Sequence, residues 1–381
     1  MQVFTLEQKQ EFIARGFTRR NFARLATMMT AGATLPFFNE PALAQLSMVK
    51  DMPPDAVKIN ANENPLGPCP EAAEAIYGVV KKGGRYLYEE TFAMQETLAA
   101  SEGLKPNYVQ AFAGSSAPLH QAVLAFTSPT KSFVIADPGY EAGERAAKFV
   151  GAKVVRVPLK RDYAHDVRAM ATTDPNAGLI YVCNPNNPTG TITSRSDIEW
   201  LVANKPSGCV VLIDEAYIHI AGAHMASDLV AQDKDVIILR TFSKLYGMAG
   251  LRAGAALGRP DLIEKIMPYS AGALPVTAMV GANVSLKQKN LVPERRKIIK
   301  DVREDVFAYM DKNNFKYVPS VSNKFMADTG RPGGEVIEAM RQEKVYIGRV
   351  WPSWPNYVRI SIGTPEEMAK FKIAYKKVMT A

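Results

Sequence analysis

Between residues 108 and 258 the sequence alternates short apolar runs with helical stretches, and this alternation strongly limits the possible folds. Continuous apolar runs are typical of strands that are buried on both faces, and the stretches between them fit crossover helices. Such a chain folds into an α/β domain with a mainly parallel sheet. We predict seven strands, at Val109–Ala113, Phe133–Ala136, Lys153–Val157, Leu179–Cys183, Val210–Asp214, Val236–Arg240 and Ala253–Leu257.

The pattern changes after about Pro268. Val276 to Met310 predicts a long helix that is interrupted near Pro293. A smaller α+β unit should follow, with strands near Tyr317, Phe325, Val345 and Val358 and a final helix from about Pro365. We therefore divide the chain into a signal (1–44), an N-terminal arm that joins the small domain (45–72), a large domain (73–272) and a small C-terminal domain (273–381).

The first 44 residues resemble a bacterial twin-arginine export signal. Arg19 and Arg20 precede a weakly apolar stretch, Leu25–Phe38, and Ala42-Leu43-Ala44 supplies a small-residue cleavage pattern. The apolar stretch is shorter than the ~20 residues that span a bilayer. We expect this segment to lie outside the fold and to direct the protein to the periplasm; a disordered basic tail or an uncleaved anchor is the alternative.

Composition narrows the classes of protein to which this chain can belong. The apolar content of 47% is ample for a large core, and the net charge of +8 is spread along the chain. No dense block of Lys and Arg alternates with aromatic residues, so we expect no nucleic-acid partner, and nothing after the signal resembles a membrane span. The predicted strands place Cys183 and Cys209 roughly a strand length (~15 Å) apart, which predicts free, buried thiols.

Polar residues follow the predicted strands at their carboxyl ends, where open α/β sheets bind ligands. Lys244 follows the sixth strand and Asp214 ends the fifth. An amine and a carboxylate placed in this way suit a pyridoxal phosphate enzyme. The lysine forms a Schiff base, and the carboxylate keeps the cofactor's pyridine nitrogen protonated. Further polar groups follow other strands: Ser115, Ser116, Tyr140, Asn187, Tyr217, Ser243 and Arg252.

Each of these groups also has an ordinary explanation. The Gly114-Ser115-Ser116 turn offers N–H groups and hydroxyls to a phosphate, but alone it could be a simple helix cap. Asn187 lies in a turn that two prolines make rigid, which favours a role in a site. A solvated lysine or a capping aspartate would be unremarkable singly. Their occurrence at consecutive strand ends favours one site.

The motifs N-P-N-N-P-T-G (184–190), D-E-A-Y (214–217) and T-F-S-K-x-x-G-M-A-G-L-R (241–252) resemble the histidinol-phosphate aminotransferase branch of the fold type I aminotransferases. The resemblance runs from about Asn60 to the C-terminus. It also includes the runs 62–67 and 359–364 and the pair Arg85-Tyr86. It implies an aspartate-aminotransferase-like large domain that binds pyridoxal 5'-phosphate, and no metal.

The resemblance also implies residue roles. Lys244 would carry the internal aldimine and shuttle a proton, and Asp214 would pair with the pyridinium nitrogen. Around them, the resemblance places Asn187 and Tyr217 on the ring's phenolic oxygen, Tyr140 stacked on the ring, and Ser115, Ser116, Ser243 and Arg252 on the phosphate. Tyr86 would reach the neighbouring subunit's phosphate, which implies a homodimer with shared active sites. The substrate would be bound by Arg359, Arg349 and Asn187.

The sequence departs from the family at three places. Ser116-Ala117-Pro118 stands where an acidic residue is usual, and Gln45–Ile59 contains no tyrosine for the substrate side. The loop 350–357 is rich in aromatic residues, including Trp351 and Trp354, which could line the substrate pocket or pack against the small domain. The roles of these two rings stay open.

The resulting hypothesis is an exported aminotransferase that moves an amino group from an amino acid or related amine to a 2-oxo acid. Export argues against histidinol phosphate as the donor, because histidine synthesis is cytoplasmic, and the Trp-rich loop favours a bulky side chain. The same fold and Lys/Asp pair also serve lyases, decarboxylases and oxidases. A catalytically silent binding protein is a third alternative.

Overall fold

The computed structural model describes residues 6–18, 52–270 and 272–380. The predicted seven-stranded, mainly parallel sheet is confirmed, with the strand order β2-β8-β7-β6-β5-β3-β4. β8 runs antiparallel to both of its neighbours, and the other pairs are parallel. The strands are β2 (Val109–Phe112), β3 (Ser132–Asp137), β4 (Val154–Pro158), β5 (Ala177–Cys183), β6 (Val210–Asp214), β7 (Val236–Thr241) and β8 (Gly254–Gly258).

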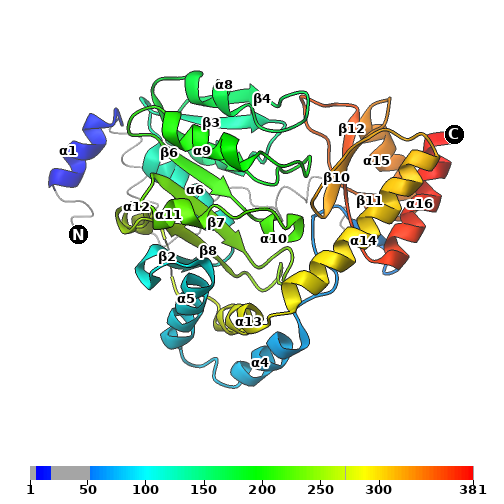
Figure 1. Cartoon of the computed structure of the whole chain (residues 1–381), viewed down its shortest axis with the longest axis horizontal. Coiled ribbons are helices and arrows are strands. Elements are labelled where there is room, and N and C mark those ends of the chain that lie inside the picture. Colours follow the sequence, from blue (N-terminus) through cyan, green and yellow to red (C-terminus); the bar gives the residue numbers. More distant parts are fainter. Residues whose placement is uncertain (1–5, 19–51, 271, 381) are drawn as a thin grey trace.

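Helices pack around this sheet and bury it (Figure 1). Every residue of β5, β6 and β7 is buried, which explains why these strands are apolar without alternation. No helix in the described ranges combines the length and apolar character needed to cross a bilayer. The connecting helices are α6 (Ser116–Phe126), α7 (Ala142–Phe149), α8 (Val167–Thr172), α9 (Arg195–Asn204), α10 (Ile218–Ala221), α11 (Ser227–Ala231) and α12 (Pro260–Ile266), with short 3₁₀ turns η2 (Pro106–Tyr108) and η3 (Met267–Tyr269).

Three further helices pack together beside β2, at the lower edge of Figure 1. They are α4 (Pro70–Val80), α5 (Tyr88–Glu102) and α13 (Val276–Lys287). α13 is the first half of the predicted long helix, and α14 (Leu291–Lys312) is the second. The interruption predicted near Pro293 is found at residues 288–290, and Pro293 itself lies in the first turn of α14. A proline is tolerated there, since the first N–H groups of a helix have no partner within it.

The small domain has its own core, formed by residues such as Phe325, Ile360 and Phe371. β10 lies between β9 and β12 in an antiparallel sheet, and β1 of the N-terminal arm pairs in parallel with β11. The arm therefore adds a strand to the small domain. The elements are β1 (Val57–Ile59), β9 (Tyr317–Val318), β10 (Lys324–Asp328), α15 (Gly333–Gln342), β11 (Val345–Ile347), β12 (Tyr357–Ser361) and α16 (Pro365–Thr380).

Part of the segment expected outside the fold packs against it. α1 (Leu6–Ala14) is followed by Arg15, whose guanidinium donates hydrogen bonds to the carbonyls of Leu124, Ala125 and Thr127 at 3.2, 2.7 and 3.1 Å. The side chains of Phe12 and Phe17 are buried in the large-domain core. Arg19, Arg20 and the rest of the export motif lie outside the described residues.

The three cysteines are free and buried, as predicted. Cys183 ends β5 and Cys209 precedes β6, so the sheet separates the two thiols. Burial raises the pKa of Cys209 to about 12, which keeps this thiol protonated and unreactive at neutral pH.

Candidate active site

The ends of three adjacent strands bring the predicted catalytic groups together. Asp214, the last residue of β6, lies opposite Cys183 of β5 and Leu239 of β7. Asn187 follows β5 and Lys244 follows β7, so these residues lie on either side of Asp214. All three polar side chains are buried. Because parallel strands end at the same edge, residues far apart in the chain meet here.

The Lys244 ammonium and the Asp214 carboxylate are close enough to interact electrostatically. The Nζ atom of Lys244 lies 5.7 Å from the centre of the Tyr217 ring. Burial raises the pKa of Asp214, whereas the Tyr181 hydroxyl, at 2.8 Å, and the Lys244 ammonium act to lower it. A buried carboxylate of this kind gains from a neighbouring cation, so it suits a protonated pyridine ring.

Three residues that the sequence analysis did not single out support this cluster. Tyr181 donates its hydroxyl to Asp214, and Asn62 donates its amide to the Tyr217 oxygen at 3.1 Å. Lys324 is fully buried, with its Nζ 3.0 Å from the centre of the Tyr217 ring. Asn62 belongs to the matched run 62–67 and could have been found there. Tyr181 and Lys324 occur within strands and carry no local signal.

The predicted phosphate-binding residues converge beside α6. Arg252 donates to the Ser243 hydroxyl at 3.2 Å and to the Ala113 carbonyl at 3.3 Å. A Cβ atom on Gly114 would lie 2.1 Å from the Arg252 guanidinium, so only glycine allows this approach. Ser115 is the N-cap of α6, and Ser116 is its first residue. Hydroxyls, a guanidinium and a helix N-terminus are the donor set that fits a phosphate ester.

Tyr140 is buried near both parts of the site. It interacts electrostatically with Arg252 on the phosphate side and with Tyr181 beside Asp214. An aromatic ring here would suit one face of a planar cofactor.

The small domain supplies the other end of the site. Arg359 is fully buried and donates to the Asn187 side-chain oxygen at 3.0 Å and to the Asn60 carbonyl at 2.7 Å. The Trp351 ring lies 4.1 Å from the Arg349 guanidinium and 5.5 Å from that of Arg359. Trp351 also donates its ring N–H to the Gly139 carbonyl of the large domain at 2.9 Å.

The two tryptophans of the aromatic loop therefore differ. Trp351 lies against the two arginines. Trp354 instead packs against Tyr163 and Tyr357, with ring centres 5.7 and 4.8 Å apart. Both alternatives left open by the sequence describe Trp351, which lies beside the arginines and also packs on Val318 and Met326 of the small domain, whereas packing alone describes Trp354.

Tyr86 lies apart from these groups. It occurs between α4 and α5, is 72% exposed, and stacks on Tyr88 with ring centres 5.7 Å apart. Within one subunit the structure therefore does not bring Tyr86 to the phosphate-binding residues.

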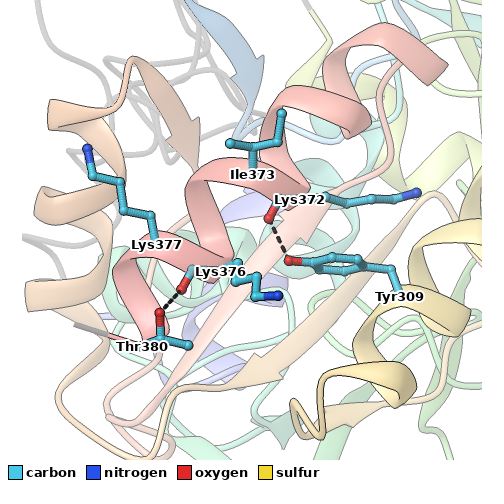
Figure 2. Close-up of a pocket in the computed structure, with 6 residues that line it drawn as sticks. All are labelled: Tyr309, Lys372, Ile373, Lys376, Lys377 and Thr380. Atoms are coloured by element: carbon cyan, nitrogen blue, oxygen red, sulfur yellow. Dashed lines mark hydrogen bonds between the residues drawn. The ribbon is translucent and has the colours of Figure 1, made fainter.

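A surface hollow of about 390 Å³ lies on the small domain between α14 and α16 (Figure 2). The Tyr309 hydroxyl donates to the Lys372 carbonyl at its edge, at 2.6 Å. Lys372 and Lys377 form ion pairs with Asp305 and Glu343. None of the predicted site residues lines this hollow, so we do not assign it as the active site.

Comparison with known proteins agrees with this geometry. Residues 54–372 match the family described as aminotransferase class I and II. A histidinol-phosphate aminotransferase from Moorella thermoacetica is 31% identical over 336 residues, which cover 85% of this chain and 86% of the relative. An aromatic amino acid aminotransferase from Cutibacterium acnes is 32% identical over 322 residues, covering 82% and 90%.

A solved structure has the same fold. The histidinol-phosphate aminotransferase from Sinorhizobium meliloti, in complex with pyridoxal-5'-phosphate, superposes with a TM-score of 0.77 at 22% identity. The match covers 90% of this chain and 95% of that protein. The predicted aspartate-aminotransferase-like fold is thus confirmed.

Proposed function

The chain belongs to the class I and II aminotransferase family and is a pyridoxal phosphate-dependent transaminase, and from this premise we propose residue roles, an assembly and a location for it. The supporting observation is that Lys244 and Asp214 are both buried at one sheet edge with Tyr217 beside them. The opposite arrangement, with the two groups on different sides of the sheet, would have left no common site.

Pyridoxal phosphate, when bound, supplies an electron sink for the bond that breaks at the donor's α-carbon. Lys244 would hold the cofactor's aldehyde carbon and move the proton at that α-carbon. Asp214 would keep a proton on the ring nitrogen, and its own position is fixed by Tyr181 and the Ala216 N–H. Tyr217 and Asn187 would orient the ring by hydrogen bonds to its phenolic oxygen.

The remaining polar groups would bind the two ends of the cofactor–donor pair. Ser115, Ser116, Ser243 and Arg252 would hold the cofactor phosphate, and Tyr140 would cover the ring. Arg359 would bind an anionic group of the donor, since its planar guanidinium is already oriented by Asn187 and Asn60.

The reaction class is tested with purified enzyme, an amino acid and 2-oxoglutarate. Glutamate should form in equal amount with the 2-oxo acid product. Release of carbon dioxide, ammonia or peroxide without glutamate would instead support a decarboxylase, lyase or oxidase.

A homodimer is supported by exposed apolar side chains that are concentrated between residues 66 and 92. Large apolar side chains are exposed on α4, α5 and the segments that flank them, and such groups in soluble proteins commonly mark interfaces. They are Leu66, Tyr77, Val80, Tyr86, Tyr88 and Phe92.

With a shared active site, inactive Lys244→Ala and Tyr86→Ala chains should regain activity when they are mixed, because one hybrid site keeps both residues. No recovery from mixed, exchanged subunits would contradict sharing.

Export by the twin-arginine route is supported by Arg19-Arg20 and by the three free, buried thiols, which suit a chain that folds in a reducing compartment before export. Changing both arginines to lysine should retain the protein in the cytoplasm, as cell fractionation would show. Mass spectrometry of the exported chain should give a start near Gln45. A mature chain that keeps Phe12 and Phe17 would contradict cleavage.

A further inference from the structure

Arg349 is paired with a carboxylate that the sequence analysis did not connect with the site. Its two terminal nitrogens bind the two carboxylate oxygens of Glu141, one of them at 3.0 Å. The Arg349 side chain is 8% exposed and that of Glu141 is 28% exposed. A bidentate pair of this kind is geometrically specific, and its partial burial limits screening by solvent.

The pair lies at the donor end of the site. Glu141 directly follows Tyr140 and is the N-cap of α7 in the large domain, whereas Arg349 belongs to the small domain. The Trp351 ring contacts the Arg349 guanidinium, and its centre also lies 5.5 Å from the Arg359 guanidinium. The Glu141–Arg349 pair is thus one aromatic ring away from the arginine that is oriented by Asn187.

We propose that Glu141 determines donor specificity by neutralising Arg349, so that the site favours donors whose anionic group is a singly charged carboxylate over donors whose anionic group is a doubly charged phosphate. This inference rests on the proposed function of Arg359 as the anion-binding residue. A donor's single carboxylate would bind Arg359. A phosphate, with two negative charges, would need Arg349 as well as Arg359 and would have to displace the Glu141 carboxylate from Arg349.

The charge balance explains the preference. Arg349, Arg359 and Glu141 together carry one net positive charge, which matches one carboxylate. Without Glu141 the same pocket would carry two positive charges and would suit a phosphate ester. Trp351 is 2% exposed and packs on Val318 and Met326, and its ring lies against both guanidinium groups, so the two arginines stay side by side.

The test compares two donors in Glu141→Gln, which keeps the shape and a hydrogen bond to Arg349 but removes the charge. Phenylalanine represents a donor whose anionic group is a carboxylate, and histidinol phosphate represents a donor whose anionic group is a phosphate. We expect the ratio of kcat/KM for histidinol phosphate to that for phenylalanine to rise by about tenfold or more, mainly through KM. Competitive inhibition by inorganic phosphate should strengthen in the same variant.

Ser353→Ala is the matched control. The Ser353 hydroxyl binds the Asp137 carboxylate across the same domain junction at 2.7 Å, so its loss weakens the junction without changing the charge at Arg349. We expect this variant to change both donors by the same factor. If Glu141→Gln also changes both donors equally and leaves phosphate inhibition unaltered, the pair only fastens the two domains and the specificity role is wrong.

The result can be separated from a failure of the proposed function. In the wild type, amino-group transfer from phenylalanine to 2-oxoglutarate establishes the reaction before any variant is compared. Absence of transfer from every amino donor would overturn the transaminase assignment. Normal transfer with an unchanged donor ratio in both Glu141→Gln and Glu141→Ala would overturn only the role of Glu141.

Discussion

The two ends of the active site are built differently. The cofactor end uses residues at the carboxyl ends of neighbouring strands in one sheet, with Asp214 and Lys244 at its centre. The donor end is assembled across two domains, since Arg349 and Arg359 come from the small domain and Glu141 and Asn187 from the large one. The cofactor end is therefore fixed by one sheet, whereas the donor end depends on how two domains meet.

This difference indicates where the chain can vary. Changes at the cofactor end should remove the chemistry for every donor. Changes at the donor end should alter which donor is used and leave the chemistry in place. The predictions below test that separation, from the largest expected effect to the smallest.

Lys244→Ala should have the largest effect and should act on all donors alike. Without the amine, turnover should fall by about a thousandfold or more, because both the covalent attachment and the proton transfer are lost. Borohydride should no longer fix the cofactor to the chain, which mass spectrometry can measure. Lys234→Ala, at an exposed lysine, is the control. Normal turnover in Lys244→Ala would contradict the assignment of the chemistry to the cofactor end of the site.

Asp214→Asn should lower kcat by about a hundredfold to a thousandfold, or roughly 3–4 kcal/mol, because the ring nitrogen loses the anion that keeps it protonated. Tyr181→Phe should cost less, on the order of 1 kcal/mol, since it removes one hydrogen bond to Asp214. Steady-state kinetics with phenylalanine and histidinol phosphate should give the same loss for both donors. A loss confined to one donor would show that the two ends of the site are not separate.

Acid should destabilise the large domain through two histidines. Burial lowers the pKa of His165 and of His219 to about 4, from a usual value of 6.5. The unfolded chain takes up these protons near pH 6.5 and the folded chain only near pH 4. Their contribution to stability is therefore complete above pH 6.5 and is lost as the pH falls toward 4, by on the order of 2–3 kcal/mol for each histidine.

Urea unfolding at pH 7.5 and pH 5 measures this effect. His165→Gln should reduce the difference between the two pH values, whereas His224→Gln, at a mostly exposed histidine, should leave it unchanged. Equal stability at both pH values in the wild type would contradict the burial of the two imidazoles.

Lys324→Met tests a small-domain charge that reaches the cofactor end. The buried ammonium lies on the Tyr217 ring and lowers the pKa of Asp214 together with Lys244. The Lys324 ammonium disfavours a second positive charge nearby, including protonation of the bound cofactor. Its removal should therefore raise the pH at which the bound cofactor's absorbance titrates, by about one unit. Lys376→Met, at an exposed lysine of the same domain, should cause no shift. An unchanged titration in Lys324→Met would mean that Lys324 only fills space.

Much of the fold could be predicted from the sequence. The observed strands β2 to β8 differ from the predicted ones by two residues or fewer at each end, because strands buried on both faces form apolar runs that end abruptly. The break before α14 could be predicted near Pro293, because proline is compatible with the first turn of a helix and not with its interior. The packing of Phe12 and Phe17 was missed because the basic, apolar pattern of that segment indicated only export.

The site was predictable to the extent that it follows strand ends. Lys324 and Tyr181 were missed because a polar side chain inside a strand can face either a site or an ordinary neighbour, and the pattern does not say which. The ion pair between Glu141 and Arg349 joins residues 208 positions apart. A glutamate after a tyrosine and an arginine after a glycine have no distinguishing pattern of their own.

The sequence by itself determined the parallel sheet and the group of residues at its edge, because apolar periodicity places strands and strand direction places their ends. Only the tertiary structure decided which charges meet across the domain junction. The reason is physical: hydrophobic periodicity acts over a few residues, whereas the partner of a charged side chain is set by the relative position of whole domains. The relative position of the two domains pairs Arg349 with Glu141 and brings the Lys324 ammonium onto the Tyr217 ring.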